Sequence, residues 1–201
     1  MFCKNCGQQI PDQDGYCPNC GTHNTVNDAR SFSQQAKNAA NDAFESTNQG
    51  LNNAFDDVKQ TFQGTRPSGG PLRTDRSLAV YIILSIITLG LYSYYFIYRI
   101  AQDMNEACKG DGETTGGLAT FIILSFVTCG FYSLYWEYKL GNRLANNAPR
   151  YGLSFQENGT TVLLWYLVGM FVCGIGPFVA MYIIIKNCNL LFDGYNRAMN
   201  F

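Results

Sequence analysis

Charged side chains are scarce in this chain and nearly balanced, with 14 Lys and Arg against 15 Asp and Glu in 201 residues. No basic excess is available to neutralise phosphates, which argues against a nucleic-acid partner. Only one histidine is present, and the sequence contains no phosphate-binding loop, HExxH pattern or Ser/His/Asp set. These absences predict a non-enzymatic protein with no evident small-molecule substrate.

Charge is missing altogether from three long stretches, residues 77–98, 114–136 and 158–185. A helix of about 20 apolar residues crosses the hydrocarbon layer of a bilayer. A helix in a soluble protein rarely has so long an uncharged run, because its outer face meets water. The sequence therefore predicts a mainly α-helical membrane protein whose first partner is the lipid bilayer of the cell membrane.

Two cysteine motifs of the form CxxCG open the chain, at residues 3–7 and 17–21. Two residues between thiolates allow both sulfurs to reach one face of a tight turn, and two such turns make a tetrahedral four-thiolate site. The predicted ligands are Cys3, Cys6, Cys17 and Cys20. We expect residues 1–25 to be a zinc ribbon with one Zn²⁺, because so short a segment buries too little core to fold alone.

A four-thiolate zinc site has no open coordination position, so we expect the metal to be structural and to have no catalytic role. Residues 1–25 contain one basic side chain, Lys4, against Asp12 and Asp14, which favours a protein contact over a phosphate contact. Cysteines at ligand spacing also indicate a reducing compartment, which places the ribbon in the cytoplasm. The other cysteines, Cys108, Cys129, Cys173 and Cys188, are scattered, and we interpret them as apolar filler.

The segment 26–64 contains no proline and has apolar residues at helical spacing. We predict an amphipathic helical linker here, followed by a Pro- and Gly-containing hinge over residues 65–76. Three uses of the helix remain open: a soluble spacer, packing against copies of itself, or contact with the membrane surface. The apolar stripe consists of Phe32, Ala36, Ala40, Phe44, Leu51, Phe55, Val58 and Phe62.

The remaining sequence, residues 77–201, contains an internal repeat. A shift of 40 residues brings residues 84–99 onto 124–139 with the same Leu-Ser, Thr-x-Gly-x-Tyr-Ser and final basic positions. A third, weaker match follows around residues 172–177, so we divide this domain into units 77–108, 114–148 and 158–196. In the first two units the residues Tyr92, Phe96 and Arg99, and likewise Tyr132, Trp136 and Lys139, are typical of membrane-interface anchors.

Each unit is interrupted by glycine, and two arrangements fit this pattern. The break either kinks a helix that crosses the bilayer once, or it turns the chain back so that the unit enters and leaves on the same side. Halves of about 12 residues would extend only ~18 Å, to roughly the middle of the bilayer. We favour three kinked single spans, because exposed backbone at a turn within lipid must find hydrogen-bond partners.

The repeated runs, ILSIITLGLYSYYFIY and FIILSFVTCGFYSLYWEYK, and the NLLFDGYN segment near the end resemble bacterial membrane proteins of domain-of-unknown-function family 4234. The resemblance covers about residues 76–200, and its third unit departs from the Thr-x-Gly-x-Tyr core. It implies a membrane location. Because the family has no assigned activity, the resemblance implies no chemistry and no functional residue.

Three functions from different classes fit these features. The first is a membrane scaffold or adaptor whose ribbon and helix bind a protein partner or further copies of the chain. The second is a self-assembling oligomer of shallow hairpins that shapes the membrane. The third is a small channel or transporter, although no ionised side chain within the apolar stretches offers an ion-coupling site.

Overall fold

The computed structural model describes residues 2–3, 5–10, 16–22, 25–62, 69–169, 171 and 174–201, and for residues 25–31 and 62 it describes the backbone only. The described chain is mainly helical and divides into two compact units, Met1–Asn48 and Gln49–Phe201. No helix in the described ranges is both long enough and apolar enough to cross a bilayer.

The expected helix of the linker runs without interruption as α1 (Thr25–Phe62). The division between the two units falls inside it, so that the part from Gln49 onward packs with the repeats. The start of the predicted hinge, residues 65–68, lies outside the described residues. The rest of the hinge, residues 69–76, leads into the repeated domain without helix or strand.

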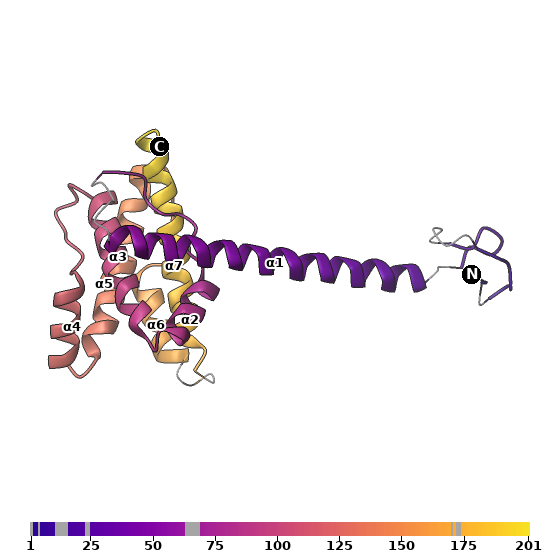
Figure 1. The fold of residues 1–201 in the computed structure, drawn as a ribbon, viewed down its shortest axis with the longest axis horizontal. Helices are drawn as coiled ribbons and strands as arrows, with labels where there is room; N and C mark the ends of the chain where they lie inside the picture. Colours follow the sequence, from indigo (N-terminus) through magenta and orange to yellow (C-terminus); the bar gives the residue numbers. More distant parts are fainter. Residues whose placement is uncertain are drawn as a thin grey trace. The chain divides into compact units, whose positions relative to one another are not determined.

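The repeated domain consists of three helical hairpins, each a short helix followed by a longer one (Figure 1). We call them hairpins 1, 2 and 3 in chain order, and a short 3₁₀ helix, η1 (Ala148–Tyr151), separates the second from the third. Their helices are α2 (Leu78–Ile87) with α3 (Leu91–Ala107), α4 (Leu118–Val127) with α5 (Phe131–Asn147), and α6 (Gly159–Gly169) with α7 (Gly176–Ala198).

The glycine break reverses the chain, so the favoured kinked single span is wrong for these helices. In hairpin 1, Leu89 and Gly90 both adopt positive φ, 51° and 90°, and the N–H of Gly90 bonds the carbonyl of Ser85 at 2.7 Å. This bond pattern ends α2 in a Schellman motif and turns the backbone. The reversal brings Tyr81 against Phe96, with ring centroids 4.9 Å apart.

A threonine in the turn forms hydrogen bonds to backbone groups of the helices before and after it. The Thr88 hydroxyl donates to the carbonyl of Leu84 at 2.7 Å and accepts from the N–H of Tyr92 at 2.9 Å. It thus caps the end of α2 and the start of α3 at once. Thr128 makes the same two bonds in hairpin 2, at 2.7 and 2.8 Å. The repeated Thr-x-Gly-x-Tyr pattern is therefore the sequence of a hairpin turn.

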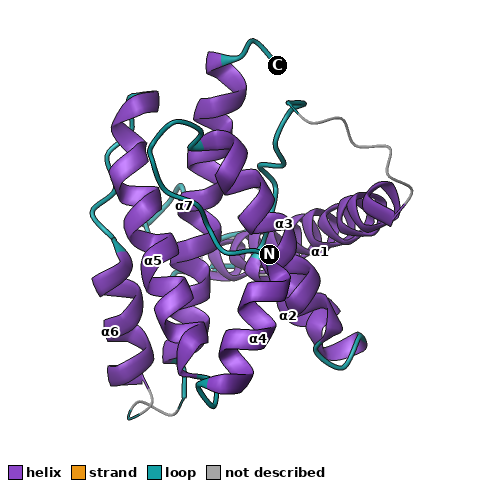
Figure 2. Ribbon diagram, turned by 90° about the vertical axis from the view of Figure 1, so that its left-hand side faces the viewer, coloured by secondary structure: helices purple, strands orange, loops and turns teal. Residues whose placement is uncertain are grey.

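The three hairpins form a closed ring with approximate three-fold repetition. The long helices lie inside, with α7 packed against both α3 and α5, and each short helix lies between its own long helix and that of the preceding hairpin. Thus α4 contacts α5 and α3, α6 contacts α7 and α5, and α2 contacts α3 and α7. Figure 2 shows the turns of hairpins 1 and 2 at one end of this ring, where α6 also ends and α7 begins.

Asparagine side chains connect each hairpin to the segment that leads into the next. Asn105 on α3 exchanges two hydrogen bonds, of 2.8 and 3.1 Å, with the backbone of Thr115 ahead of α4. Asn142 on α5 accepts from the N–H of Gly159 at 3.0 Å. On α7, Asn189 pairs in the same two-bond manner with the backbone of Arg76 ahead of α2, which closes the ring.

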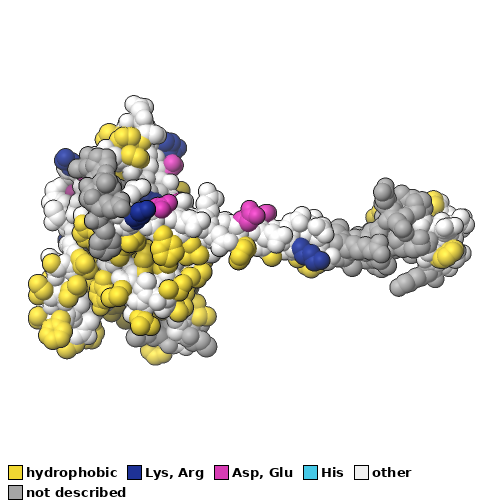
Figure 3. Space-filling view, viewed as in Figure 1, with side chains coloured by type: hydrophobic (Ala, Val, Ile, Leu, Met, Phe, Trp, Pro, Cys, Tyr) yellow, Lys and Arg dark blue, Asp and Glu magenta, His cyan; other side chains and the backbone are white. Residues whose placement is uncertain are grey.

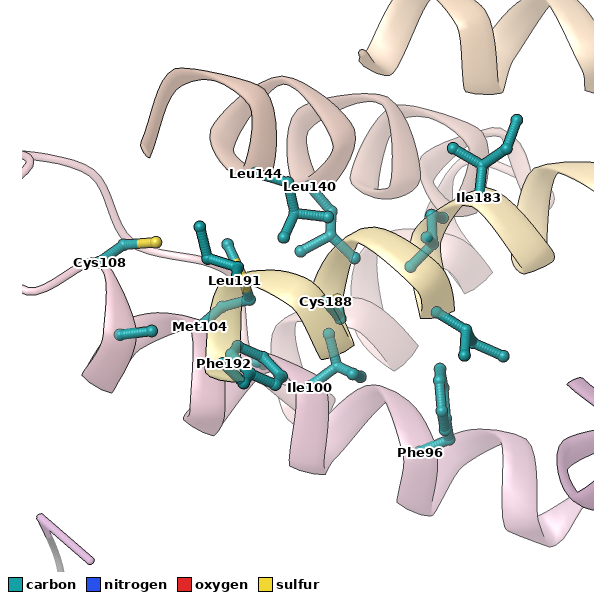
Figure 4. Packing of buried hydrophobic residues seen from close by; sticks show 14 of the residues in the cluster. Phe96, Ile100, Met104, Cys108, Leu140, Leu144, Ile183, Cys188, Leu191 and Phe192 are labelled. Carbon is teal, nitrogen blue, oxygen red and sulfur yellow. The ribbon is translucent and has the colours of Figure 1, made fainter. Parts of the chain in front are cut away.

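The interior of the ring is filled by side chains of the long helices (Figure 4). Ile100 and Met104 of α3, Leu140 and Leu144 of α5, and Phe192 of α7 are each at most 1 % exposed. The aromatic residues Phe96 and Trp136, which the sequence placed at a membrane interface, belong to this core instead.

Removing the Thr88 hydroxyl tests the turn. We expect Thr88→Val to lower the free energy of unfolding by about 1–2 kcal/mol, because the N–H of Tyr92 loses its partner while the Leu84 carbonyl keeps the backbone N–H of Thr88. Thr88→Ser retains the hydroxyl and most of the stability. Thermal unfolding in a mild detergent, followed by circular dichroism, measures both. Equal midpoints for the Val and Ser variants would contradict the role assigned to the hydroxyl.

Candidate functional site

The two CxxCG motifs fold into a pair of matching turns. In the first, the N–H of Gly7 bonds the carbonyl of Cys3 at 2.9 Å, and in the second the N–H of Gly21 bonds the carbonyl of Cys17 at 2.8 Å. Both glycines have positive φ, 74° and 68°, which residues with a side chain adopt at a cost. The turns aim their sulfurs at one point.

The four predicted ligands come together. The Sγ atoms of Cys3, Cys6, Cys17 and Cys20 all lie within 4.8 Å of one another. The Sγ atoms of Cys3 and Cys20 are 3.6 Å apart, and those of Cys6 and Cys17 are 3.5 Å apart. A tetrahedron with Zn–S bonds of about 2.3 Å has edges of about 3.8 Å, so the cluster fits a tetrahedral thiolate-bound metal.

Thr22 supports the ligand set from just behind it. Its hydroxyl lies 3.1 Å from the Sγ of Cys20 and receives a hydrogen bond from the Asn5 amide at 3.1 Å, which links the two turns. Hydrogen bonds from the Thr22 side chain and backbone lower the pKa of Cys20 to about 6. Cys20 is thus mainly a thiolate, the form that binds metal, at neutral pH.

The other cysteines are not brought to this cluster. Cys108 and Cys188 are buried in the hairpin domain as free thiols, in keeping with apolar filler, while Cys129 is exposed in the turn of hairpin 2. Cys173 lies outside the described residues.

A second candidate site is the end of the ring where the turns of hairpins 1 and 2 lie, beside the end of α6 and the start of α7. Its side chains are apolar and exposed: Leu89 is 93 % exposed, Phe126 86 % and Phe171 91 %. Figure 3 shows hydrophobic side chains gathered over this end. We call it the apolar end, and its further exposed members are Ile86, Ile87, Leu91, Val127, Phe131, Leu167, Val168, Ile175 and Phe178.

The ionised side chains of the hairpin domain lie beyond the uncharged stretches, in what we call the polar rim. On hairpin 1, Arg99 is an ion-paired residue, with its Nη2 at 3.5 Å from Asp103 and its Nε at 3.6 Å from Asp57 of α1. Asp103 also pairs with Arg76, whose guanidinium lies over the Phe192 ring. Arg99 therefore holds the rim together internally, where the sequence suggested a side chain reaching for lipid head groups.

On hairpin 2 the rim is built around the buried Arg143. Its Nε and Nη2 donate to the two oxygens of Asp111 at 2.8 and 3.0 Å, a bidentate pair. Its Nη1 donates to Asn105 at 2.6 Å and to Thr115 at 2.7 Å. This pairing with Arg143 lowers the pKa of Asp111 to about 2. The network fixes the loop between hairpins 1 and 2.

Comparison with known families adds to this geometry. The family described as "Domain of unknown function (DUF4234)" matches twice, over residues 76–146 and 117–189, and together these matches cover more than half of the chain. The chain belongs to this family. A zinc-ribbon domain matches residues 2–24, which with the four close sulfurs indicates a bound zinc. No curated protein and no solved structure matches the chain.

The two family matches are informative in their spacing. Each covers two hairpins, and the second starts one hairpin later than the first. Hairpin 3 is therefore a member of the repeat, although its sequence lacks the threonine of the other turns. There α6 and α7 approach through glycine, since a Cβ on Gly169 would lie 2.0 Å from the Cα of Gly176.

Sequence analysis did not single out Asp57, Asp111 or Asn142. Asp57 lies 42 positions before Arg99, and Asp111 lies 32 positions before Arg143, so no local pattern joins the partners. Asn105 and Asn189 did carry a signal, because they coincide at the same shift that aligns the first and third units.

Replacing one ligand tests the metal centre. We expect Cys6→Ser to remove stoichiometric zinc from the purified protein, because a serine oxygen is a much poorer ligand than a thiolate. Zinc content and the thiolate–cobalt absorption band after substitution by Co²⁺ measure the change. Cys129→Ser, the matched control, should leave both unchanged, and equal zinc in the two variants would contradict the assignment.

Acid titration tests the Asp111–Arg143 pair. The depressed pKa of Asp111 means that its contribution to stability is present above its ordinary pKa near 3.8 and is lost as the pH falls toward about 2. We expect Asp111→Asn to lower the free energy of unfolding by about 3 kcal/mol at neutral pH, because Arg143 loses its charge partner. Denaturant unfolding in detergent at several pH values should show the variant and parent converging in acid, and a constant difference would refute the linkage.

Proposed function

We propose that this chain is a non-enzymatic membrane scaffold. Its three hairpins insert their apolar end into one leaflet of the cell membrane. Its zinc ribbon and the first part of α1 stay in the cytoplasm and bind protein partners, second copies of the chain included. The zinc ion has a structural role, because four cysteines occupy all positions of a tetrahedral site.

The apolar end carries this proposal. A soluble protein rarely exposes so many large apolar side chains side by side, and such patches mark contact with lipid or with another protein. The short helices α2 and α4 have ten residues each and extend about 15 Å, which is about half of the roughly 30 Å hydrocarbon layer. The turns of hairpins 1 and 2 suit lipid, since the Thr88 and Thr128 hydroxyls accept from the N–H groups of Tyr92 and Tyr132, which hydrocarbon would leave unpaired.

The polar rim supports the same placement. Lys139 follows the turn glycine Gly130 by nine residues, about 14 Å along α5, which brings its half-exposed side chain to the head-group level when the turn lies at mid-bilayer. The loops between hairpins then lie on one side of the membrane. Four thiolate ligands at the ribbon require reducing conditions, so we assign that side to the cytoplasm.

The ten-residue length of α2 and α4 favours the membrane-shaping alternative as a second function. Hairpins that end in the middle of the bilayer add volume to one leaflet only. An assembly of such hairpins would expand that leaflet and make it the convex face of a curved membrane. The channel alternative lacks such an observation, because buried side chains such as Leu140, Leu144 and Phe192 fill the interior of the described ring.

Flotation with liposomes tests insertion. The double variant Phe126→Glu and Phe131→Glu places two charges on the turn of hairpin 2, where both side chains are exposed, so the fold should survive. We expect it to lose most of its co-flotation, because a carboxylate in hydrocarbon costs several kcal/mol. Phe44→Glu on α1 is the matched control, and it should float like the parent.

Loss of flotation in the Phe44 variant alone would mean that α1 holds the chain at the membrane and would refute the proposal. Topology gives a second measure in intact cells, by labelling single cysteines at Lys109 and Gln156 with an impermeant reagent after Cys129→Ser. Hairpins inserted from the cytoplasmic side protect both positions. Labelling of position 109 from outside would restore the single-span arrangement and contradict one-leaflet insertion.

A further inference from the structure

The last part of α1 covers one face of hairpin 1. Ala54 is fully buried against Val80 and Leu84, and Leu51 packs at the edge of this cluster. The approach is close, because a Cβ on Gly50 would lie 2.9 Å from Val80. An apolar surface on hairpin 1 is thus filled by apolar side chains of α1.

The same part of α1 brings a carboxylate to the polar edge of that face. The Tyr95 hydroxyl donates to the Asp57 carboxylate at 3.0 Å and lies 3.1 Å from the Thr61 hydroxyl. The Arg99 Nε lies 3.6 Å from the same carboxylate. The part of α1 that occupies this face is therefore amphipathic. It is apolar over Leu84 and carries a carboxylate near Arg99.

Hairpin 2 presents the equivalent face with nothing in the described chain over it. A shift of 40 residues carries Leu84 onto Leu124 and Arg99 onto Lys139. Leu84 is 1 % exposed and Leu124 is 37 % exposed. The Arg99 side chain is 6 % exposed, whereas the Lys139 side chain is 50 % exposed. The same face is thus covered in hairpin 1 and uncovered in hairpin 2. We therefore interpret the face on hairpin 2 as a binding site whose ligand is not part of the described chain.

The uncovered face is a groove of about 310 Å³. Its lining changes character along its length, from Leu124 and Tyr132 near the turn to Lys139 and Arg143 at the rim. From Tyr132 to Arg143 it follows α5 for about 16 Å, close to the depth of one leaflet. A groove parallel to the hairpin suits an acyl chain that stands in the bilayer, whereas a helix lying across the hairpin would cover only part of it.

The charges at the mouth of the groove specify the head group. Lys139 and Glu113 lie 3.8 Å apart, both about half exposed, so the mouth offers one cation and one anion. The charge of Arg143 is neutralised by Asp111 and adds no net charge. A head group that carries a phosphate next to a primary ammonium complements this pair, because the ammonium donates hydrogen bonds that quaternary choline lacks.

We propose that the groove between α4 and α5 is a binding site for one phosphatidylethanolamine-type lipid. The phosphate meets Lys139, the ammonium meets Glu113, and an acyl chain runs toward Leu124 along Tyr132. This inference rests on the proposed insertion of the hairpins into a leaflet and names the lipid class recognised there. Hairpin 1 lacks such a site, because α1 occupies the equivalent face.

The two tryptophans separate this site from general insertion. Trp136 lines the groove, and Trp165 is a partly exposed residue of α6, outside it. Full-length Trp165→Phe and Trp136→Phe variants each retain one indole. They are reconstituted in phosphatidylcholine vesicles containing brominated-chain phosphatidylethanolamine, phosphatidylglycerol or phosphatidylcholine, and quenching of tryptophan fluorescence is measured. Insertion alone predicts equal quenching of Trp165 by all three lipids.

Binding in the groove predicts stronger quenching of Trp136 by brominated phosphatidylethanolamine than by the other two. Lys139→Gln and Glu113→Gln should each raise the half-quenching fraction of that lipid at least about threefold, because a charge-assisted hydrogen bond is lost. Lys109→Gln, an exposed rim lysine outside the groove, should not change it. Native mass spectrometry of the detergent-extracted protein should show one retained lipid, which Lys139→Gln removes.

Three results would overturn the site while leaving insertion intact. Equal quenching of Trp136 by all three lipids means that bulk lipid fills the groove. Selective quenching by phosphatidylglycerol means that the head group is misassigned. Protection of Trp136 from every brominated lipid, with Trp165 still quenched, means that a protein segment covers the face. If Trp165 also escapes quenching, the proposed insertion itself fails.

Discussion

The hairpin turns determine where the other features of residues 49–201 lie. Two successive residues with positive φ, Leu89 with Gly90 and Cys129 with Gly130, end α2 and α4 and send the following helix back beside each of them. The Thr88 and Thr128 hydroxyls satisfy backbone groups on both sides of the reversal. Because each uncharged stretch is folded at its middle, the apolar turns gather at one end of the ring and the ionised residues at the other.

The three hairpins share one backbone arrangement, but their side chains differ at matching positions and form different contacts. The position that is Asp103 in hairpin 1 is Arg143 in hairpin 2. Asp103 therefore forms ion pairs with Arg76 and Arg99, whereas Arg143 forms its ion pair with Asp111. The sequence of hairpin 3 lacks the turn threonine, and its helices α6 and α7 come into close contact at Gly169 and Gly176. The shared backbone plan thus carries three different surfaces.

The sequence predicts the local parts of this structure well. Four cysteines at CxxC spacing specify their own cluster, because ligand geometry depends on a few neighbouring residues. The hairpin reversal was one of two arrangements that fitted the sequence, and it was not the favoured one, because leucine at position 89 gives no sign of positive φ and a Leu-Gly break suits a kink as well as a turn. On α1 the predicted apolar stripe included Phe55, but this side chain is exposed. The helix contacts hairpin 1 through Ala54 instead, whose small side chain permits the close approach.

The bonds that close the ring have a consequence for chain connectivity. Asn196 near the end of α7 exchanges two hydrogen bonds of 2.7 Å with the backbone of Leu72, which lies ahead of α2, so the last helix completes the packing of the first hairpin. In their contacts with one another, the six hairpin helices give no hairpin a special place as the first, although α1 packs on hairpin 1. Circular permutation that joins the end of α7 to α2 and opens the loop between hairpins 1 and 2 retains every neighbour among the six hairpin helices. The order of the hairpins along the chain is therefore separable from their order in space.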